Sequence, residues 1–287
     1  MTTPDPLGAG TAAPPVCPRH PDRISYVRCQ RCGRPVCPQC QRPAAVGVHC
    51  VDCVAAASRT APVARTAFGG RVRGGRPVVT LTLISVSVGS YLLQLTTPGW
   101  TTRWAFSPAI GSVQPYRFLT AAFLHSPASF LHIVFNMVAL WTVGPLLEQM
   151  LGRARYLTLY LMAAVGGSVG SVLLAPLTDS WNVAIVGASG AVFGLFGAIL
   201  VVLRRVGADA RGILGVIVIN LVIGFVPGLG IAWQAHVGGL VVGLLLGLAY
   251  AHAPAPRRRL VAVAAPAAVA ALLVVATVLV YRSFGLL

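Results

Sequence analysis

Residues 187–204 read GASGAVFGLFGAILVVLR, a stretch of small and apolar residues whose single charge is an arginine at its end. A helix needs about 20 such residues to cross the apolar part of a bilayer. Runs of this kind recur along the chain and predict seven spans, with approximate bounds 78–95, 129–147, 154–174, 187–204, 211–227, 233–251 and 260–281. The segment 96–128 is too polar for a span, so we expect an interfacial loop there. The sequence therefore predicts an all-α polytopic membrane protein.

Composition agrees with this fold class. The chain is 56% hydrophobic and only 10% charged, whereas an ordinary soluble domain carries about 25% charged residues. This argues against a large soluble α-protein. The absence of lysine and the abundance of alanine, glycine, valine and arginine suggest a GC-rich bacterial genome, and hence a bacterial cell membrane.

The net charge of +16 comes from arginines, and their positions predict an orientation. With a cytoplasmic N-terminus, nineteen arginines fall inside and three, Arg103, Arg117 and Arg282, fall outside. Such a bias is typical of cytoplasmic loops. It accounts for the charge without a nucleic-acid partner, and we expect none.

Four polar residues of the predicted spans stand out, because polar groups inside a membrane are costly and usually functional. They are His132, Asn136, Ser189 and His236. Under the predicted orientation, the three spans that carry them all run from outside to inside. Each residue lies within about two turns of its span's start, so we expect all four at a similar depth near the outer face.

These residue types suit acyl transfer. A serine hydroxyl becomes a good nucleophile when a base such as histidine takes its proton. His132 and Asn136 are four residues apart, so they share a helical face and can donate hydrogen bonds to an oxyanion, as can the backbone amide of Ser189. No carboxylate has an evident route to His236, which predicts a Ser189–His236 dyad without a catalytic cofactor.

Glycines are expected to bring the serine and histidine spans together, because small residues four positions apart let transmembrane helices approach closely. The supporting glycines are Gly187, Gly190, Gly194 and Gly197 around Ser189, and Gly239 and Gly243 after His236.

Three motifs, in this order along the chain, resemble those of the rhomboid family of intramembrane serine proteases. The stretch His132-Ile-Val-Phe-Asn136 resembles the H-x-x-x-N motif, Gly187-Ala-Ser-Gly190 resembles G-x-S-G, and His236 with its glycines resembles the catalytic-histidine helix. The resemblance covers about residues 77–252. It implies a six-helix bundle, to which this chain adds one C-terminal transmembrane helix.

The resemblance also implies a function and a set of roles. Ser189 and His236 would cleave transmembrane protein substrates near the outer face, and His132 and Asn136 would support the oxyanion. Phe193 would pack against His236, one turn below Ser189, where relatives often have tyrosine. Tyr116-Arg117 stands where many relatives have Trp-Arg. The alternatives are a catalytically inactive rhomboid-like protein that binds membrane clients, and a transporter or channel, which would carry more polar residues deep in its spans.

A second pattern precedes the spans. Four pairs of Cys or His residues are each separated by two residues: Cys17 and His20, Cys29 and Cys32, Cys37 and Cys40, and Cys50 and Cys53. Eight such ligands can hold two tetrahedral zinc ions. Disulfides are the alternative, but the predicted cytoplasmic side is reducing. The spacing resembles a B-box-type finger, in which alternate pairs share an ion; sequential pairing stays open. We expect a structural or partner-docking role for this module.

The sequence thus divides into five parts. We expect a disordered N-terminus (1–15), a zinc-binding module (16–54), an arginine-rich linker (55–76), a rhomboid-like core (77–252) and an additional transmembrane helix (253–287).

Overall fold

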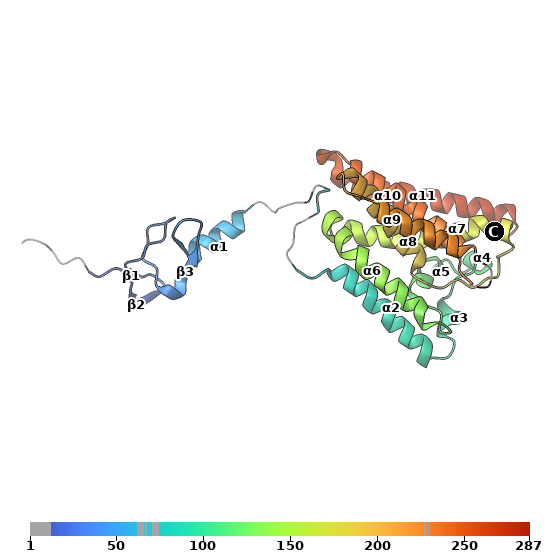
Figure 1. Ribbon diagram of the computed structural model, residues 1–287, viewed down its shortest axis with the longest axis horizontal. Helices are drawn as coiled ribbons and strands as arrows, with labels where there is room; N and C mark the ends of the chain where they lie inside the picture. The colour runs from blue at the N-terminus through green and yellow to red at the C-terminus, as the bar shows by residue number, and fades with distance from the viewer. Residues whose placement is uncertain (1–12, 62–65, 67, 71–74, 227, 229) are drawn as a thin grey trace, which may run out of the picture. The chain divides into compact units, whose positions relative to one another are not determined.

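The computed structural model describes residues 13–61, 66, 68–70, 75–226, 228 and 230–287. Most of the expected disordered N-terminus, and residues 62–65, 67 and 71–74 of the expected linker, lie outside the described residues. The chain forms two compact units, Met1–Val63 and Ala64–Leu287. In Figure 1 the described part of the first unit is blue, and the colours of the second run through green and yellow to red at the C-terminus.

The N-terminal unit is built from two small hairpins and a helix. Strand β1 (Val16–Cys17) pairs antiparallel with β2 (His20–Ile24), and β3 (Gln41–Pro43) pairs antiparallel with β4 (Val48–Cys50). Helix α1 (Val51–Thr60) follows, and the Cys50 sulfur caps its first turn by accepting from the amide of Cys53. The helix continues past residue 54, where we expected the linker to begin.

This unit has almost no hydrocarbon core. Its buried cluster consists of one valine and five cysteines: Cys17, Cys29, Val36, Cys37, Cys40 and Cys50. So small an apolar interior stabilises a fold of this size only weakly. The unit therefore needs a further stabilising element.

In the second unit, every predicted span is a helix. They are α2 (Val78–Thr96), α6 (Phe130–Leu151), α7 (Arg153–Thr178), α8 (Ser189–Arg205), α9 (Arg211–Gly224), α10 (Trp233–His252) and α11 (Arg258–Ser283). Among the described residues, five helices are long and apolar enough to cross a membrane: α2, α6, α7, α10, and α11 with the short turn before it. The chain is thus a multi-pass membrane protein.

Helices α8 and α9 are shorter than the other five, with 17 and 14 residues. At 1.5 Å per residue, α8 is only about 26 Å long. It is nevertheless the central helix, since every residue from Gly190 to Val202 is buried. A helix surrounded by protein does not have to match the thickness of the lipid, so α8 can be shorter than the helices that face lipid.

Helix α10 packs against α8 and α7 through glycines. A Cβ at Gly239 would collide with the carbonyl of Gly190, and one at Gly243 with the carbonyl of Gly194. A Cβ at Gly238 would collide with the carbonyl of Gly166 on α7. These contacts bring the backbones together, as the small-residue spacing predicts.

The segment after α2 is a loop with three short helices, α3 (Trp100–Trp104), α4 (Pro108–Gly111) and α5 (Arg117–Thr120). The buried Arg117 guanidinium donates to the carbonyls of Thr102 and Ala105, both at 2.6 Å, and to the Gln114 side chain. One arginine therefore ties the loop together. The segment is a loop with short helices, as expected. Its place at the membrane interface stays a prediction.

At the opposite end of α6, the buried carboxylate of Glu148 caps α2. It accepts hydrogen bonds from the amides of Val79 and Thr80 and from the Thr80 hydroxyl, at 2.9–3.1 Å. Its other neighbour is Arg153, 3.6 Å away. An anion at a helix N-terminus is favourable, so Glu148 fixes the start of α2 to the end of α6.

Part of the expected linker is bound to the membrane unit. We call Thr66, Phe68, Gly69 and Gly70 the anchor segment. The Phe68 ring is 4% exposed and belongs to the main hydrophobic core. The Thr66 hydroxyl donates to the carbonyl of Met150, and Arg155 donates to the carbonyl of Phe68. We expected the membrane unit to begin at residue 77, but the anchor segment shows that it begins earlier in the chain.

The additional C-terminal helix α11 is present as expected, and its last turns reach the first loop. The buried Tyr281 hydroxyl donates to the carbonyl of Pro108 at 2.7 Å. Just beyond α11, the Phe284 ring contacts Trp181 of the α7–α8 connection, with centroids 5.2 Å apart.

Candidate active site and candidate metal centres

Ser189 is the first residue of α8 and is partly exposed. Two residues earlier, Gly187 has φ = +130°, a conformation that L side chains rarely adopt. A Cβ there would also lie 2.8 Å from Nε2 of His132. Glycine is therefore required at this turn both by the backbone and by the available space.

The first loop holds this turn in place. The Gly187 amide donates to the carbonyl of Ala121 at 3.0 Å, and Phe106 and Ile185 exchange two backbone hydrogen bonds. The loop that Arg117 organises therefore supports the residues just before Ser189.

His236 lies in the first turn of α10 and is 7% exposed. Its imidazole stacks on the Phe193 ring, with centroids 4.2 Å apart and planes within 11°. This is the packing that the family resemblance implies. A flat ring stacked in this way fixes the plane of the imidazole.

The starts of α8 and α10 are in close backbone contact beside these two residues. A Cβ at Gly190 would lie 3.2 Å from the carbonyl oxygen of Ala235, and Gly190 and Ala235 are the chain neighbours of Ser189 and His236. Among the described residues, no hydrogen bond joins Ser189 to His236, and the Nδ1 atom of His236 has no partner.

His132 lies in the first turn of α6, and its protonation follows from one contact. Its Nδ1 atom accepts a hydrogen bond from the amide of Ser126 at 3.1 Å. A neutral imidazole that accepts at Nδ1 carries its proton on Nε2. That Nε2 atom faces the position of a Gly187 Cβ, and Ser189 Oγ lies 3.7 Å from the same position. The histidine therefore presents a donor beside the serine hydroxyl.

Asn136 lies one turn further along α6 and is 7% exposed. Its amide nitrogen donates to the carbonyl of His132 at 2.8 Å. The bond ties Asn136 to the turn that carries His132, and it occupies one of the two amide hydrogens.

The structure adds His125 and Gln94 to this site, two residues that the sequence motifs do not include. His125 is fully buried, with its ring edge against His132 and centroids 5.4 Å apart. Burial, and then the neighbouring His132, lower the pKa of His125 to about 3, so its ring is neutral at physiological pH. The Gln94 side chain bonds both the amide and the carbonyl of His125 at 2.8 Å.

Neither ring nitrogen of His125 has a partner among the described residues, and the Gln94 side chain holds the backbone of His125. The signal that could have found Gln94 is a lone amide near the end of an apolar span.

The N-terminal unit contains two groups of potential metal ligands. They are Cys17, His20, Cys37 and Cys40, and Cys29, Cys32, Cys50 and Cys53; within each group all ligand atoms lie within 4.8 Å of one another. All seven cysteines are free of disulfides. Alternate pairs therefore share a site, as in a B-box-type finger, and the sequential pairing that the spacing left open is not the one observed. Both groups can hold a metal ion.

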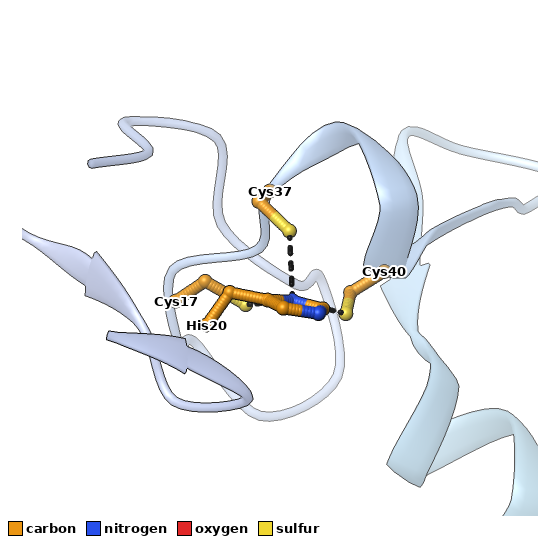
Figure 2. Close-up of side chains that lie close together, drawn as sticks. All are labelled: Cys17, His20, Cys37 and Cys40. Atoms are coloured by element: carbon orange, nitrogen blue, oxygen red, sulfur yellow. Dashed lines mark hydrogen bonds between the residues drawn. The ribbon is translucent and has the colours of Figure 1, made fainter. Parts of the chain in front are cut away.

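Figure 2 shows the first group, in which the His20 ring points between the sulfurs of Cys37 and Cys40. The Nδ1 atom of His20 lies 3.3 Å and 3.4 Å from these sulfurs and 4.0 Å from the sulfur of Cys17. In the second group, the sulfurs of Cys32 and Cys50 are 3.8 Å apart. Two sulfurs on a tetrahedral ion with bonds of about 2.3 Å would be separated by about 3.8 Å, so the geometry fits.

The surroundings also favour thiolates, which are the form that binds metal. The backbone amide of Cys37 is the main cause that lowers the pKa of Cys17, to about 6. Burial raises the pKa of Cys29, but the amides of Cys50, Arg31 and Cys32 outweigh it and hold that pKa at about 6. The other thiols are not all alike: burial and then Cys37 raise the pKa of Cys40 to about 11, and Cys50 and then burial raise that of Cys53 to about 12. Each group thus contains at least one thiol that ionises readily and one that does not.

Comparisons with known proteins agree with the fold and the motifs. The family model described as Rhomboid domain matches residues 112–253, a range that includes His132, Asn136, Ser189 and His236. The rhomboid protease GluP of Bacillus subtilis is 33% identical over 193 residues, which cover 62% of this chain and 36% of GluP. RHOMBOID-like protein 5 of Arabidopsis thaliana is 36% identical over 46% of this chain and 43% of its own length.

The rhomboid protease GlpG of Yersinia pseudotuberculosis is 30% identical over 194 residues, which cover 64% of this chain and 67% of GlpG. This chain therefore spans about two thirds of GlpG but only about a third of GluP. With the helical architecture and the family match, these relatives lead to one conclusion: the chain belongs to the rhomboid family.

Proposed function

We propose that this protein is an intramembrane serine endopeptidase that cleaves transmembrane protein substrates with Ser189 and His236. The observation that carries the proposal is the meeting of three helix starts: Ser189, His236 and His132 lie within the first turns of α8, α10 and α6. Relatives named as rhomboid proteases support the same activity.

In the proposed reaction, His236 takes the proton of Ser189 as the serine oxygen attacks the scissile carbonyl, and gives that proton to the leaving amine as the C–N bond breaks. Water, deprotonated by His236, then attacks the ester on Ser189, which releases the new carboxyl end and restores the serine hydroxyl. The oxyanion is stabilised by the Ser189 amide at the positive end of α8 and by Nε2–H of His132. Asn136 contributes by holding the turn of His132 and through its second amide hydrogen.

The catalytic unit in this proposal is a dyad. The support is that Nδ1 of His236 has no partner among the described residues, so no carboxylate orients the ring. The stacked Phe193 ring would take over that orienting role.

The missing hydrogen bond between Ser189 and His236 has to form when substrate binds. Catalytic hydrogen bonds are often long in empty sites and tighten in the substrate complex. The same observation is what favours the second candidate function, an inactive rhomboid-like protein that binds membrane clients.

The first experiment measures cleavage of a transmembrane substrate in liposomes by wild type, Ser189→Ala and His236→Ala. Cleavage near the outer membrane boundary by wild type alone supports the dyad and its depth. Loss of the base is expected to slow cleavage by about 10²–10⁴-fold. The matched control is Ser171→Ala, whose hydroxyl donates to Gly167 in its own helix and whose loss should leave cleavage unchanged.

A fluorophosphonate probe separates the two candidates without a known substrate. An active protease is labelled, and Ser189→Ala abolishes the label. A folded wild-type protein that takes no label would favour the client-binding function.

We further propose that the two Cys/His groups bind structural zinc, one ion each, and that this unit is cytoplasmic and able to dock a partner. Thiolate and imidazole ligands in a tetrahedral set of four are the preferred environment of Zn²⁺. The positive-inside distribution of arginines supports the orientation, and the inferred bacterial origin supports a cell-membrane location.

A further inference from the structure

Helix α11 is only shallowly packed along most of its length. Of its 26 residues, four are buried: Pro266, Val269, Thr277 and Tyr281. Tyr281, the one aromatic residue of the helix, lies in the last turn and is 2% exposed. The helix therefore makes its largest side-chain insertion at its C-terminal end.

The turn that follows α11 is a Schellman motif. The Leu286 amide donates to the carbonyl of Tyr281 at 2.8 Å, and the Gly285 amide donates to the carbonyl of Arg282 at 3.2 Å. Gly285 has φ = +67°, the left-handed conformation with which this motif ends a helix. The turn folds Leu286 back against the cluster that contains Tyr281.

The Tyr281 side chain inserts into the first loop. Its hydroxyl donates to the carbonyl of Pro108, the first residue of α4, at 2.7 Å. A Cβ at Gly111 would lie 2.5 Å from that hydroxyl, so the glycine leaves the space that the hydrogen bond needs. The ring belongs to a small buried cluster, which consists of Phe106, Ala121, Val172 and Tyr281.

The same stretch of the loop supports the turn before Ser189. Pro108 follows Phe106 by two residues, and Phe106 exchanges two backbone hydrogen bonds with Ile185. Ile185 in turn precedes Gly187 by two residues, and Gly187 precedes Ser189 by two. A contact that restrains Pro108 therefore restrains the backbone that leads to the proposed nucleophile.

The end of α11 also contacts the other side of this pairing. The Phe284 ring packs on Trp181, with centroids 5.2 Å apart, and the Trp181 carbonyl accepts from the Ala109 amide at 2.9 Å. Tyr281 thus contacts the first loop, and Phe284 contacts the α7–α8 connection that the loop pairs with. We call these two residues the latch.

We propose that the latch fixes the turn before Ser189 and that Tyr281 is a positioning residue for the reaction. This inference rests on the proposed protease function. Among the described residues no hydrogen bond joins Tyr281 to Ser189, so Tyr281 acts through the pairing of Phe106 with Ile185. The Ser189 amide, a proposed oxyanion donor, has to stand where charge develops. Loss of the latch should therefore slow the chemical step and leave substrate binding unchanged.

The test compares full-length wild type, Tyr281→Phe and Thr277→Val in liposomes. Tyr281→Phe removes the hydroxyl and keeps the ring. Thr277→Val is the matched control, because its hydroxyl lies one turn earlier and donates to Leu273 of the same helix. Dividing the cleavage rate by the amount of serine that a fluorophosphonate labels excludes unfolded protein. We expect kcat to fall about tenfold in Tyr281→Phe with KM unchanged, which corresponds to a displacement of less than about 1 Å.

Hydrogen exchange tests the latch without relying on activity. The amides of Ile185 and Gly187 donate to the carbonyls of Phe106 and Ala121. In Tyr281→Phe their exchange should be about fivefold faster, the effect of losing one hydrogen bond, and in Thr277→Val it should be as in wild type.

The two measurements separate the latch from the proposed function. A wild type that neither cleaves nor takes the label would refute the proposed function, and the exchange rates would still decide whether the latch holds the turn. Unchanged exchange in Tyr281→Phe would overturn the latch. An unchanged kcat, or an equal loss of kcat in Thr277→Val, would overturn the positioning role of Tyr281.

Discussion

At the scale of single residues, Gly187 is the position where backbone and space agree most strictly. Its φ of +130° excludes most side chains, and the missing Cβ leaves room for Nε2 of His132. Because Gly187 has no side chain, His132, the proposed oxyanion donor, can lie close to Ser189, the proposed nucleophile.

Substitution Gly187→Ala is expected to abolish most cleavage and to destabilise the protein by about 1–3 kcal/mol through backbone strain. Cleavage assays and thermal unfolding in detergent measure both effects. The control is Gly89→Ala in α2, where a Cβ meets nothing within 4 Å. Wild-type activity in Gly187→Ala would contradict the proposed geometry.

His132→Ala is expected to lower kcat by about 10²–10³-fold, the usual cost of one oxyanion donor. KM should change little, since the lost bond forms only as negative charge develops. Steady-state kinetics in liposomes separate the two constants. His252→Ala, an exposed histidine at the end of α10, should leave both as in wild type. An equal loss in both variants would argue against a specific role for His132.

At the scale of helices, the contact between α8 and α10 sets the distance between the proposed nucleophile and base. It consists of backbone against backbone at Gly190 and Gly239, and again at Gly194 and Gly243. Such a contact has little tolerance for added volume.

Gly243→Val should therefore separate the two helices and cost about 1–3 kcal/mol or more, because the new side chain meets rigid backbone. Thermal unfolding reports the stability and cleavage reports the helix separation. Gly215→Val on α9, where a Cβ meets nothing within 4 Å, is the matched control. If the two variants behaved alike, the close packing of α8 and α10 would not matter for function.

Much at this scale was predictable from sequence. Apolar runs gave all seven helices, and the direction of the spans indicated that Ser189 and His236 start theirs on the same side. Contacts between distant side chains were not predictable in this way. Glu148 stands near the end of a span, where a solvated carboxylate is the natural interpretation, yet it caps a helix 68 residues away in sequence. The orientation of the His125 ring likewise depends on packing that no spacing encodes.

At the scale of the whole molecule, the two units are stabilised differently. The membrane unit has a large buried core, whereas the N-terminal unit buries five cysteines and one valine. If the two Cys/His groups bind metal as proposed, the binding contributes to the folding free energy of the smaller unit alone.

We expect two zinc ions per chain by elemental analysis, and loss of β-structure in residues 16–60 on chelation, with the membrane helices retained. His20→Ala should reduce the metal content to one ion or none. His49→Gln should retain both ions, since His49 belongs to neither ligand group. A metal content that His20→Ala does not change would refute the assigned ligand set.

The anchor segment also has a mechanical consequence. The Thr66 amide donates to the carbonyl of Gly70, and the Gly70 amide donates back to the Thr66 hydroxyl, so the segment is a closed loop with Phe68 in the core. The anchor segment precedes α2 in the chain, so a force applied to the N-terminal unit acts on the anchor segment before it acts on α2. The load then passes through Met150 into the end of α6, the helix that carries His132 at its other end. A pull on the N-terminal unit is therefore borne by α6, and α2 is shielded from the strain until Phe68 leaves the core.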